Sequence, residues 1–542
     1  MSSDGQQPTT TMTFELLKTA IKDGGARLGR LTFSGRRTVD TPNFFGLTSR
    51  GVIPHVTPDN VEKHLHTNGT YMALEDFIER PQQYMTRSPP IYETPSPVNK
   101  PLNSFTAMPS SIITVLGSRR LPAVCSPMGN TNQGISVFTS TGFQAVTTKE
   151  YINAVQTLNP DIAIPLADLT HKTNTPTSKR ALRMAERTDD WIKEWFTEMY
   201  TKKDSKIATF APVLPISYSM QWEYLERLSE EHASNPAVLS GLAVYDADLI
   251  PDISSSSSSS NKYKNLDPLP RLALTAPSNP HQVLRQLSLG MDIFLLPFLS
   301  TASDAGIALS FTFPPPPPPP NNPTSTSTSE SAAAPESDLP LPLLPLGIDM
   351  SSPSHSVSLL PLTTNSCTCY ACTTHHRAFV QHLLCAREML GWTLLQIHNH
   401  AVVASFFAAI REALADGTFE EKARLFALRY EPEIPSGLGE RPRARGYHFK
   451  SEGPNEVKKN KPAWSKFEGE GEGGEQGKEE KKEKTVEEKV DELRIQDEQS
   501  GTTSALASGV DSVAETPLVP DENADAKDLE EKGFAETVEE KK

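Results

Sequence analysis

Short apolar runs alternate with longer amphipathic stretches through the first 300 residues. The strand-length apolar runs are 26–33, 111–115, 162–166, 209–215, 241–245 and 272–275. The segments with a helical period of apolar residues are 148–158, 178–200, 220–232 and 280–289. Strands separated by helix-length segments are typical of parallel β-α units. The sequence therefore predicts an α/β fold with enough units to close a barrel.

A further amphipathic helix is predicted near residue 400. Val403, Phe406, Phe407, Ile410 and Leu414 recur at the spacing of one helix face. Gly417 follows directly and is suited to end the helix.

Two low-complexity segments interrupt the α/β pattern. Residues 254–260 are all serine, and 314–320 are all proline, followed by a Ser/Thr/Pro-rich stretch to about residue 337. Such segments bury too little apolar surface to fold, so we expect solvated loops at about 254–265 and 314–340. A polyproline ligand for a proline-binding module is the less favoured alternative for the second.

The charge of the chain is concentrated at its end. The 542 residues carry a formal net charge of −15, and residues 466–542 hold 24 acidic and 11 basic side chains. Residues 441–466 hold eight basic and two acidic side chains, with aromatic residues between them. We therefore expect a disordered N-terminus (1–13), a barrel (14–365), a metal-binding subdomain with C-terminal helices (366–432) and a disordered basic-then-acidic tail (433–542).

Several protein classes are excluded by composition. No stretch approaches the ~20 consecutive apolar residues of a membrane-spanning helix, so no transmembrane segment is expected. The polar, Thr-rich first twelve residues resemble neither a signal peptide nor a presequence. Five cysteines in this length cannot form a disulfide scaffold, and we expect a reducing, cytoplasmic location.

Three of the cysteines form the strongest chemical signal. Cys367, Cys369 and Cys372 follow a C-x-C-x2-C pattern, and His398 comes 26 residues later. Three thiolates and one imidazole suit a tetrahedral Zn²⁺ ion without an open position, which is a structural site. Spacing alone leaves other histidines open as the fourth ligand, and three metal-free thiols are the alternative. These histidines are His375, His376, His382 and His400. Cys125 and Cys385 are isolated and are interpreted as ordinary thiols.

The cysteine run is followed by a series of short motifs. They are Arg377-Ala378-Phe379, His382-Leu383-Leu384, Glu388-Met389-Leu390 and Leu394-Leu395-x-Ile397-His398-Asn399. Upstream lie Ala26-Arg27-Leu28-Gly29-Arg30-Leu31, Thr41-Pro42-x-Phe44, Thr57-Pro58 and Ser140-Thr141-Gly142-Phe143-Gln144. Over about residues 14–430, this set resembles the tRNA-guanine transglycosylase family.

The resemblance implies a fold, a metal and a reaction. It implies a (β/α)8 TIM barrel with a zinc-binding subdomain, one structural Zn²⁺ per subunit, and His398 as the fourth ligand. It also implies exchange of guanine for queuine at the wobble position of tRNAs with GUN anticodons.

Three departures from the family pattern concern its chemistry. The aspartate that precedes the family's Ser-Gly-Gly-Phe-Gln motif is Thr139 here, and the nucleophilic aspartate of Asp-x-Phe-Asp is Leu295. The family's Val-Gln-Gly-Gly is replaced by roughly Pro215-Ile216-Ser217-Tyr218. Leucine cannot attack a ribose carbon, and threonine cannot replace a carboxylate as acid or base. The departures imply a non-catalytic subunit that pairs with a catalytic one in a heterodimer.

Two alternatives to this interpretation stay open. An active transglycosylase would need a displaced carboxylate, for which Asp168 and Asp246 are the candidates, although solvent contacts at strand ends are the favoured interpretation of both. A zinc-stabilised scaffold without an RNA role is the second alternative.

A non-catalytic barrel can still bind tRNA phosphates. The candidate contacts are Arg119, Arg120, Arg441, Arg443 and Arg445. A solvated basic linker is an equally good interpretation of 441–466. The resemblance is also compatible with peripheral association with the mitochondrial outer membrane.

Overall fold

The computed structural model describes most of the chain up to residue 442. The described residues are 12–19, 25–78, 89–96, 99–127, 129–139, 142–171, 174–201, 206–234, 239–254, 263, 265–317, 342–363, 367–439 and 442. The chain divides into two units, 1–457 and 458–542, and everything described here belongs to the first. Most of both predicted inserts, and the tail beyond residue 442, lie outside the described residues.

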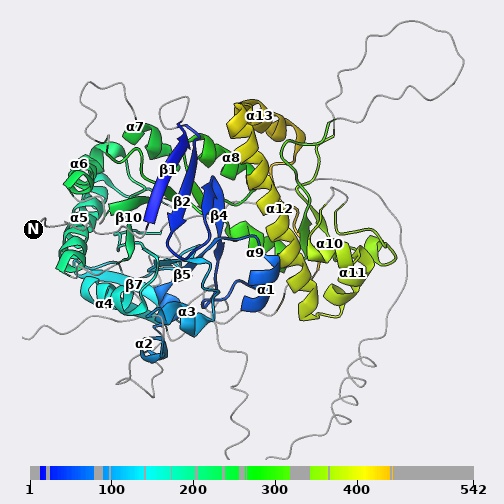
Figure 1. Cartoon of the computed structure of the whole chain (residues 1–542), viewed down its shortest axis with the longest axis horizontal. Helices are drawn as coiled ribbons and strands as arrows, with labels where there is room; N and C mark the ends of the chain where they lie inside the picture. Colours follow the sequence, from blue (N-terminus) through cyan, green and yellow to red (C-terminus); the bar gives the residue numbers. More distant parts are fainter. Residues whose placement is uncertain are drawn as a thin grey trace, which may run out of the picture. The chain divides into compact units, whose positions relative to one another are not determined.

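Eight parallel strands form a closed barrel, which confirms the predicted fold class (Figure 1). In chain order they are β4 (Asn43–Leu47), β5 (Gly69–Ala73), β6 (Ile113–Gly117), β9 (Ile162–Ala163), β10 (Ala208–Val213), β11 (Leu239–Val244), β12 (Arg271–Ala273) and β13 (Ile293–Leu295). The barrel closes where β13 pairs with β4, with Phe294 opposite Phe44. Apolar side chains fill its interior, including Phe45, Phe210 and Leu272.

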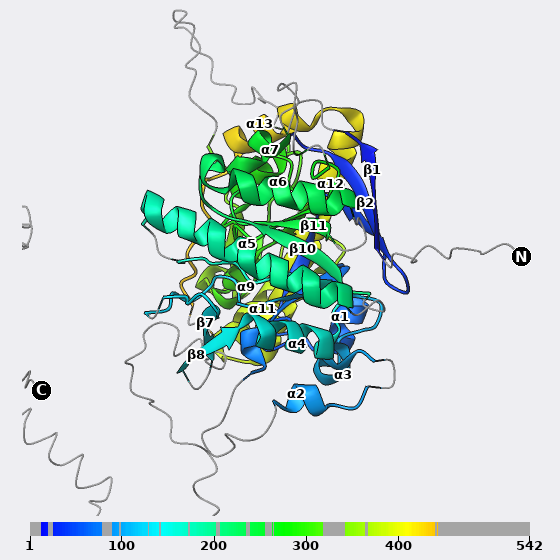
Figure 2. The same ribbon diagram turned by 90° about the vertical axis from the view of Figure 1, so that its left-hand side faces the viewer.

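Helices connect the strands and cover the outside of the barrel. They are α1 (Pro58–His64), α2 (Pro90–Glu93), α3 (Pro101–Thr106), α4 (Thr148–Leu158), α5 (Ser178–Thr201), α6 (Tyr218–Ser234), α7 (Ile250–Ser254), α8 (Pro280–Ser288) and α9 (Pro297–Asp304), with short 3-10 turns η1 (Leu74–Asp76) and η3 (Ala247–Leu249). Figure 2 shows α5 and α6 running side by side along the barrel. The predicted bounds of α4 are confirmed, because a capping box of Thr147 and Glu150 fixes its start.

Three small antiparallel sheets add to the barrel. The first comprises β1 (Met12–Lys18), β2 (Leu28–Phe33) and β3 (Val39–Thr41). The second is the hairpin β7 (Gly134–Thr139) and β8 (Gly142–Thr147), and the third pairs β14 (Ile307–Leu309) with β15 (Gly347–Asp349). Of these strands the sequence predicted only β2.

The C-terminal part of the fold is helical. It contains η4 (Pro353–His355), α10 (Tyr370–Thr374), α11 (Arg377–Cys385), α12 (Met389–Asp416) and α13 (Phe419–Arg429). The long α12 packs against α9, α11 and β4, and it carries the predicted apolar face toward the core. Gly417 ends it with φ of +75°, a left-handed conformation that favours glycine. Lys18 Nζ also donates to the carbonyls of Leu414 and Ala415, at 2.7 and 2.9 Å.

The helix α12 bears on the expectation that no segment spans a membrane. This helix is long and apolar enough to cross a bilayer by length and composition, although the sequence analysis expected no such segment. The structure buries 67% of its most apolar 18-residue window inside the protein, as is usual for a core helix. Polar residues such as Gln396 and Asn399 interrupt the apolar run, so the sequence contains no unbroken apolar stretch of membrane-spanning length. Both side chains are fully buried inside the protein.

The folded part also extends past the predicted boundary at residue 432. Pro432 accepts a hydrogen bond from Asn279 Nδ2 at 3.1 Å, and the backbone N–H of Leu438 donates to Asp349 at 2.8 Å. Polar and proline-rich composition suggested a tail from residue 433, but these backbone contacts hold 433–439 against the body of the protein.

Candidate metal centre and barrel mouth

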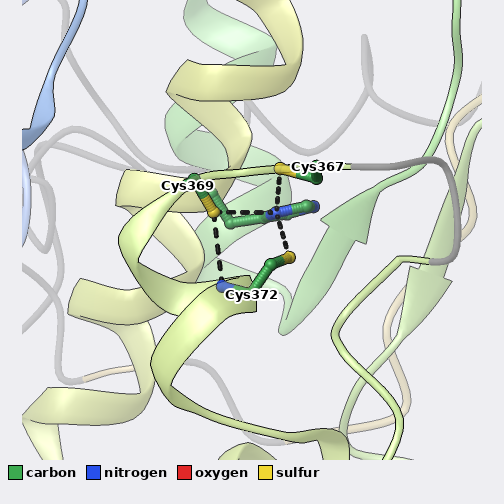
Figure 3. A group of neighbouring side chains, drawn as sticks. Cys367, Cys369 and Cys372 are labelled. Atoms are coloured by element: carbon green, nitrogen blue, oxygen red, sulfur yellow. Dashed lines mark hydrogen bonds between the residues drawn. The ribbon is translucent and has the colours of Figure 1, made fainter.

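Three cysteines and one histidine from two parts of the chain meet at one point (Figure 3). Cys367 and Cys369 precede α10, Cys372 lies in its first turn, and His398 lies in α12. Cys369 is the N-cap of α10, and its sulfur accepts the backbone N–H of Cys372 at 3.4 Å. The four ligand atoms all lie within 4.8 Å of one another. The fold thus brings together the four residues predicted as metal ligands.

The separations fit a small tetrahedral ion. His398 Nδ1 lies 3.6 Å from the sulfur atoms of Cys367 and of Cys369, and 3.3 Å from that of Cys372. Tetrahedral bonds of about 2.3 Å to sulfur and about 2.0 Å to nitrogen would separate sulfur from nitrogen by about 3.5 Å. The donor set and its spacing therefore suit a metal ion held by four protein ligands.

A buried hydrogen-bond network orients the histidine. His398 Nε2 lies 2.9 Å from the carbonyl oxygen of Leu309, so Nε2–H donates there and Nδ1 is left to bind a metal. The adjacent Asn399 accepts the backbone N–H of Leu309 at 2.8 Å and donates to Ser303 and to the Ile307 carbonyl. The His398-Asn399 pair therefore ties α12 to β14, a role of Asn399 that sequence reasoning did not identify.

The close approach of the sulfur atoms and the imidazole also shifts the pKa values of His398 and of two of the cysteines. Burial would lower the pKa of His398, but hydrogen bonds and charge interactions with Cys367 and Cys372 raise it to about 9. Hydrogen bonds with the other two cysteines lower the pKa of Cys372 and raise that of Cys369. The Cys3His cluster therefore favours a deprotonated cysteine sulfur beside a protonated His398 ring. A divalent cation bound to the same four atoms can replace the protons that they share.

The other four histidines lie outside the ligand cluster. His400 packs beside the ring of Phe44, and burial lowers its pKa to about 3. His375 stacks on Phe379, and His376 caps the start of α11. His382 is exposed on α11.

The two departures at catalytic positions lie in well-packed surroundings. The carboxyl ends of barrel strands form the mouth in which TIM-barrel enzymes place their catalytic groups. Leu295 ends β13 there and is fully buried in the barrel interior. Thr139 is also fully buried, and its hydroxyl donates to the Gly142 carbonyl at 2.9 Å. Neither side chain can supply a carboxylate. Ser140 and Thr141 lie outside the described residues.

The replaced Val-Gln-Gly-Gly segment leads into α6. Ile216 is buried, and the Tyr218 hydroxyl donates to that of Tyr263 at 2.7 Å. This segment therefore contributes packing and a tyrosine pair at the start of α6.

Asp292, the surviving carboxylate of the nucleophile motif, lies at the opposite end of the barrel. It directly precedes β13, whereas Leu295 ends that strand. Its fully buried carboxylate accepts hydrogen bonds from Arg27 Nε at 3.0 Å, Arg27 Nη2 at 2.6 Å and the backbone N–H of Arg271 at 2.8 Å. The contacts make Asp292 a structural residue.

The two candidate substitute nucleophiles are both engaged. Asp168 is fully buried and accepts a bidentate pair from Arg180 at 2.7 and 2.6 Å, together with Arg187 at 3.2 Å and Asn130 at 2.8 Å. Asp246 accepts the backbone N–H of Asp248 at 3.0 Å and caps η3. The interpretation of Asp168 as a solvent contact is wrong, because two arginines neutralise it inside the protein.

The predicted tRNA contacts divide into two groups. Arg119 and Arg120 are each only 8% exposed. Arg119 donates to Asn130 at 3.2 Å, and Arg120 forms an ion pair with Glu75 at 2.8 Å. Their expected role as surface contacts is therefore not supported, because basic character in the sequence did not reveal their burial. Arg441, Arg443 and Arg445 lie outside the described residues.

Comparison with known proteins covers most of the chain. A family model described as queuine tRNA-ribosyltransferase matches residues 23–432. A Schizosaccharomyces pombe protein is 31% identical over 444 residues, which is 81% of this chain and 89% of that protein. A Xenopus tropicalis protein is 26% identical over 74% of this chain and 96% of its own length. A Danio rerio protein is 26% identical over 73% of this chain and 95% of its own length. All three are named queuine tRNA-ribosyltransferase accessory subunit 2.

Proposed function

Because the chain belongs to the queuine tRNA-ribosyltransferase family, we propose that it is the non-catalytic subunit of a heterodimeric enzyme of that family. The partner is a catalytic subunit, and the pair exchanges guanine for queuine at the wobble position of tRNAs with GUN anticodons. The relatives' shared name, accessory subunit 2, supports this role. The cytoplasmic location, and association with the mitochondrial outer membrane, stay predictions.

The observation that carries the proposal is the replacement of the nucleophile at the barrel mouth. Exchange requires a carboxylate that attacks the ribose and holds the sugar as a covalent intermediate. Leu295 is an apolar, fully buried residue at that position. Asp168 is held by two arginines and Asp246 caps a helical turn, so neither is placed as a free nucleophile. These contacts argue against the active-enzyme alternative.

We assign the Cys3His group to one structural Zn²⁺ ion. Three sulfur atoms and one imidazole nitrogen at these separations are the donor set of closed zinc sites. With four protein ligands, the ion has no open position for an activated water. Cys367, Cys369 and Cys372 hold the α10 loop through this ion to His398 on α12.

The region around the metal group also offers a surface for the catalytic subunit. Five large apolar residues are exposed there, which we call the apolar rim: Val357, Leu359, Leu360, Met389 and Leu390. The first three lie on a segment fixed to α11, because Ala378 N–H donates to the Ser358 carbonyl and Arg377 N–H to that of Leu360, both at 2.9 Å. Exposed apolar side chains on a fixed backbone are typical of protein interfaces.

Aspartate at two rim positions should weaken the heterodimer. Val357 and Leu359 are 86% and 76% exposed, so Val357→Asp with Leu359→Asp should leave the fold intact. Burying two carboxylates in an interface should weaken binding of the catalytic subunit by about tenfold or more. Leu428→Asp, at a 63% exposed position on α13, is the matched control. Equal affinity of both variants in a titration would exclude the rim from the interface.

The tRNA contribution is assigned to the basic segment 441–466. Its eight basic residues would bind phosphates with an affinity that falls steeply as salt increases. This segment begins three residues after Leu438, whose backbone N–H donates to Asp349.

Base exchange by the separate and combined subunits tests the proposal. We expect no incorporation of labelled guanine into tRNA by this chain alone, and full exchange only after the catalytic subunit is added. Exchange by the isolated chain would support the active-enzyme alternative. Failure to bind the catalytic subunit, with queuosine unchanged when the gene is removed, would support the scaffold alternative.

A further inference from the structure

A cavity of about 330 Å³ lies beside the proposed zinc site. Its apolar side is formed by Phe311, Phe313 and Phe406. Its polar side includes Thr363, Ser405 and the exposed His66. Cys367 and Cys369 also line it, so two of the four ligand residues border a space larger than a few water molecules.

The three cysteines differ in how accessible they are. Cys367 is half-buried, whereas Cys369 and Cys372 are 8% and 9% exposed. The sulfur of Cys369 also accepts the N–H of Cys372 as the cap of α10, so this sulfur already has a hydrogen-bond donor. His398 is fully buried behind them. A small molecule in the cavity would therefore reach Cys367 before the other ligands.

We propose that Cys367 is a modification site, at which a small peroxide oxidises the zinc-bound thiolate and releases the metal. This inference rests on the zinc assignment made above. The cavity contains space for hydrogen peroxide, and access together with thiolate character decides which cysteines peroxides oxidise. The exposed Cys125 and Cys385 are outside the metal group, so their oxidation would not release the ion.

The chemistry balances with hydrogen peroxide as the oxidant. The Cys367 thiolate attacks one peroxide oxygen, an S–O bond forms, the O–O bond breaks, and hydroxide leaves and is protonated to water. The sulfur loses two electrons, and the peroxide gains them. One of the two remaining thiolates then attacks the sulfenic sulfur, forming an S–S bond and releasing a second hydroxide. Only one thiolate and His398 then remain as ligands, so Zn²⁺ leaves.

Zinc release from the full-length protein tests the inference. The test background is Cys125→Ser with Cys385→Ser, so that only the three ligand cysteines can react. Zinc released by hydrogen peroxide is followed with a chromogenic chelator. In this background, Ser405→Phe adds a ring at a residue that lines the cavity, and Glu412→Phe adds the same ring at an exposed site on α12. A sulfenic-acid probe and mass spectrometry identify the oxidised residue.

The outcomes separate the inference from the zinc assignment. We expect stoichiometric zinc at the start, a probe adduct on Cys367, and release slowed by about fivefold or more by Ser405→Phe but unchanged by Glu412→Phe. A first adduct on Cys369 or Cys372, or equal release from both variants, would overturn the inference while the zinc assignment stands. Protein purified without zinc, and unable to bind it, would overturn the assignment itself.

Discussion

Alanine in place of His398 is expected to remove the bound metal and to lower the melting temperature by about 10 °C or more. The imidazole is fully buried and is the one ligand that α12 supplies to the group. Without it, the α10 loop loses its link to α12, and the three cysteine sulfurs are left without the fourth ligand. A structural zinc site contributes its binding free energy to folding, so its loss costs several kcal/mol. Zinc content and a thermal melt measure both effects.

His382→Ala is the matched control for that experiment. His382 is exposed on α11 and lies outside the ligand cluster. We expect it to keep a full equivalent of zinc and to change the melting temperature by about 1–2 °C at most. If His398→Ala melted at the same temperature as His382→Ala, the metal would not be a structural element of this fold.

Asp292→Ala is expected to lower the free energy of unfolding by about 3–5 kcal/mol. The substitution leaves the Arg27 guanidinium charged, buried and without its carboxylate partner. It also removes the acceptor of the Arg271 backbone N–H, next to the buried Arg271 side chain. Burial lowers the pKa of Arg271 to about 10, despite the nearby carboxylates, so Arg271 remains charged at neutral pH. Denaturant unfolding measures the change.

The exposed pair of Arg30 and Asp40 provides the control. Its side chains are about half exposed, at 47% and 49%, so Asp40→Ala should change the free energy of unfolding far less than Asp292→Ala does. A small effect of Asp292→Ala on stability, together with loss of exchange activity in the heterodimer, would contradict the structural role and point to a chemical one.

Local signals in the sequence were sufficient for much of the barrel. Alternating apolar runs and amphipathic segments predicted five of its eight strands, β6 and β9–β12, because each β-α unit buries its own apolar face. The helix from Thr148 to Leu158 was predicted to the residue, since Thr147 and Glu150 cap it locally. The three cysteines lie within six residues, so their convergence required no knowledge of the fold.

Contacts between distant parts of the chain were not predictable from local sequence signals. Five histidines lie within 28 residues after Cys372, and only the folded arrangement of α10 and α12 shows that His398 reaches the sulfurs. Arg119 and Arg120 were expected at the surface, because a sequence does not reveal that Glu75 and Asn130 receive them inside the protein. The pairing of Arg27 with Asp292 spans 265 residues and has no local signal.

The burial of Leu295 makes a carboxylate costly at this position. This side chain packs in the barrel interior with Phe45 and Leu272. Leu295→Asp would place an unpaired charge among buried apolar side chains, which costs several kcal/mol before any substrate is bound. Most domains have only about 5–15 kcal/mol of stability in total. A single change to aspartate at position 295 would therefore use up a large part of the folding free energy, so a carboxylate there also requires changes in the residues packed around it.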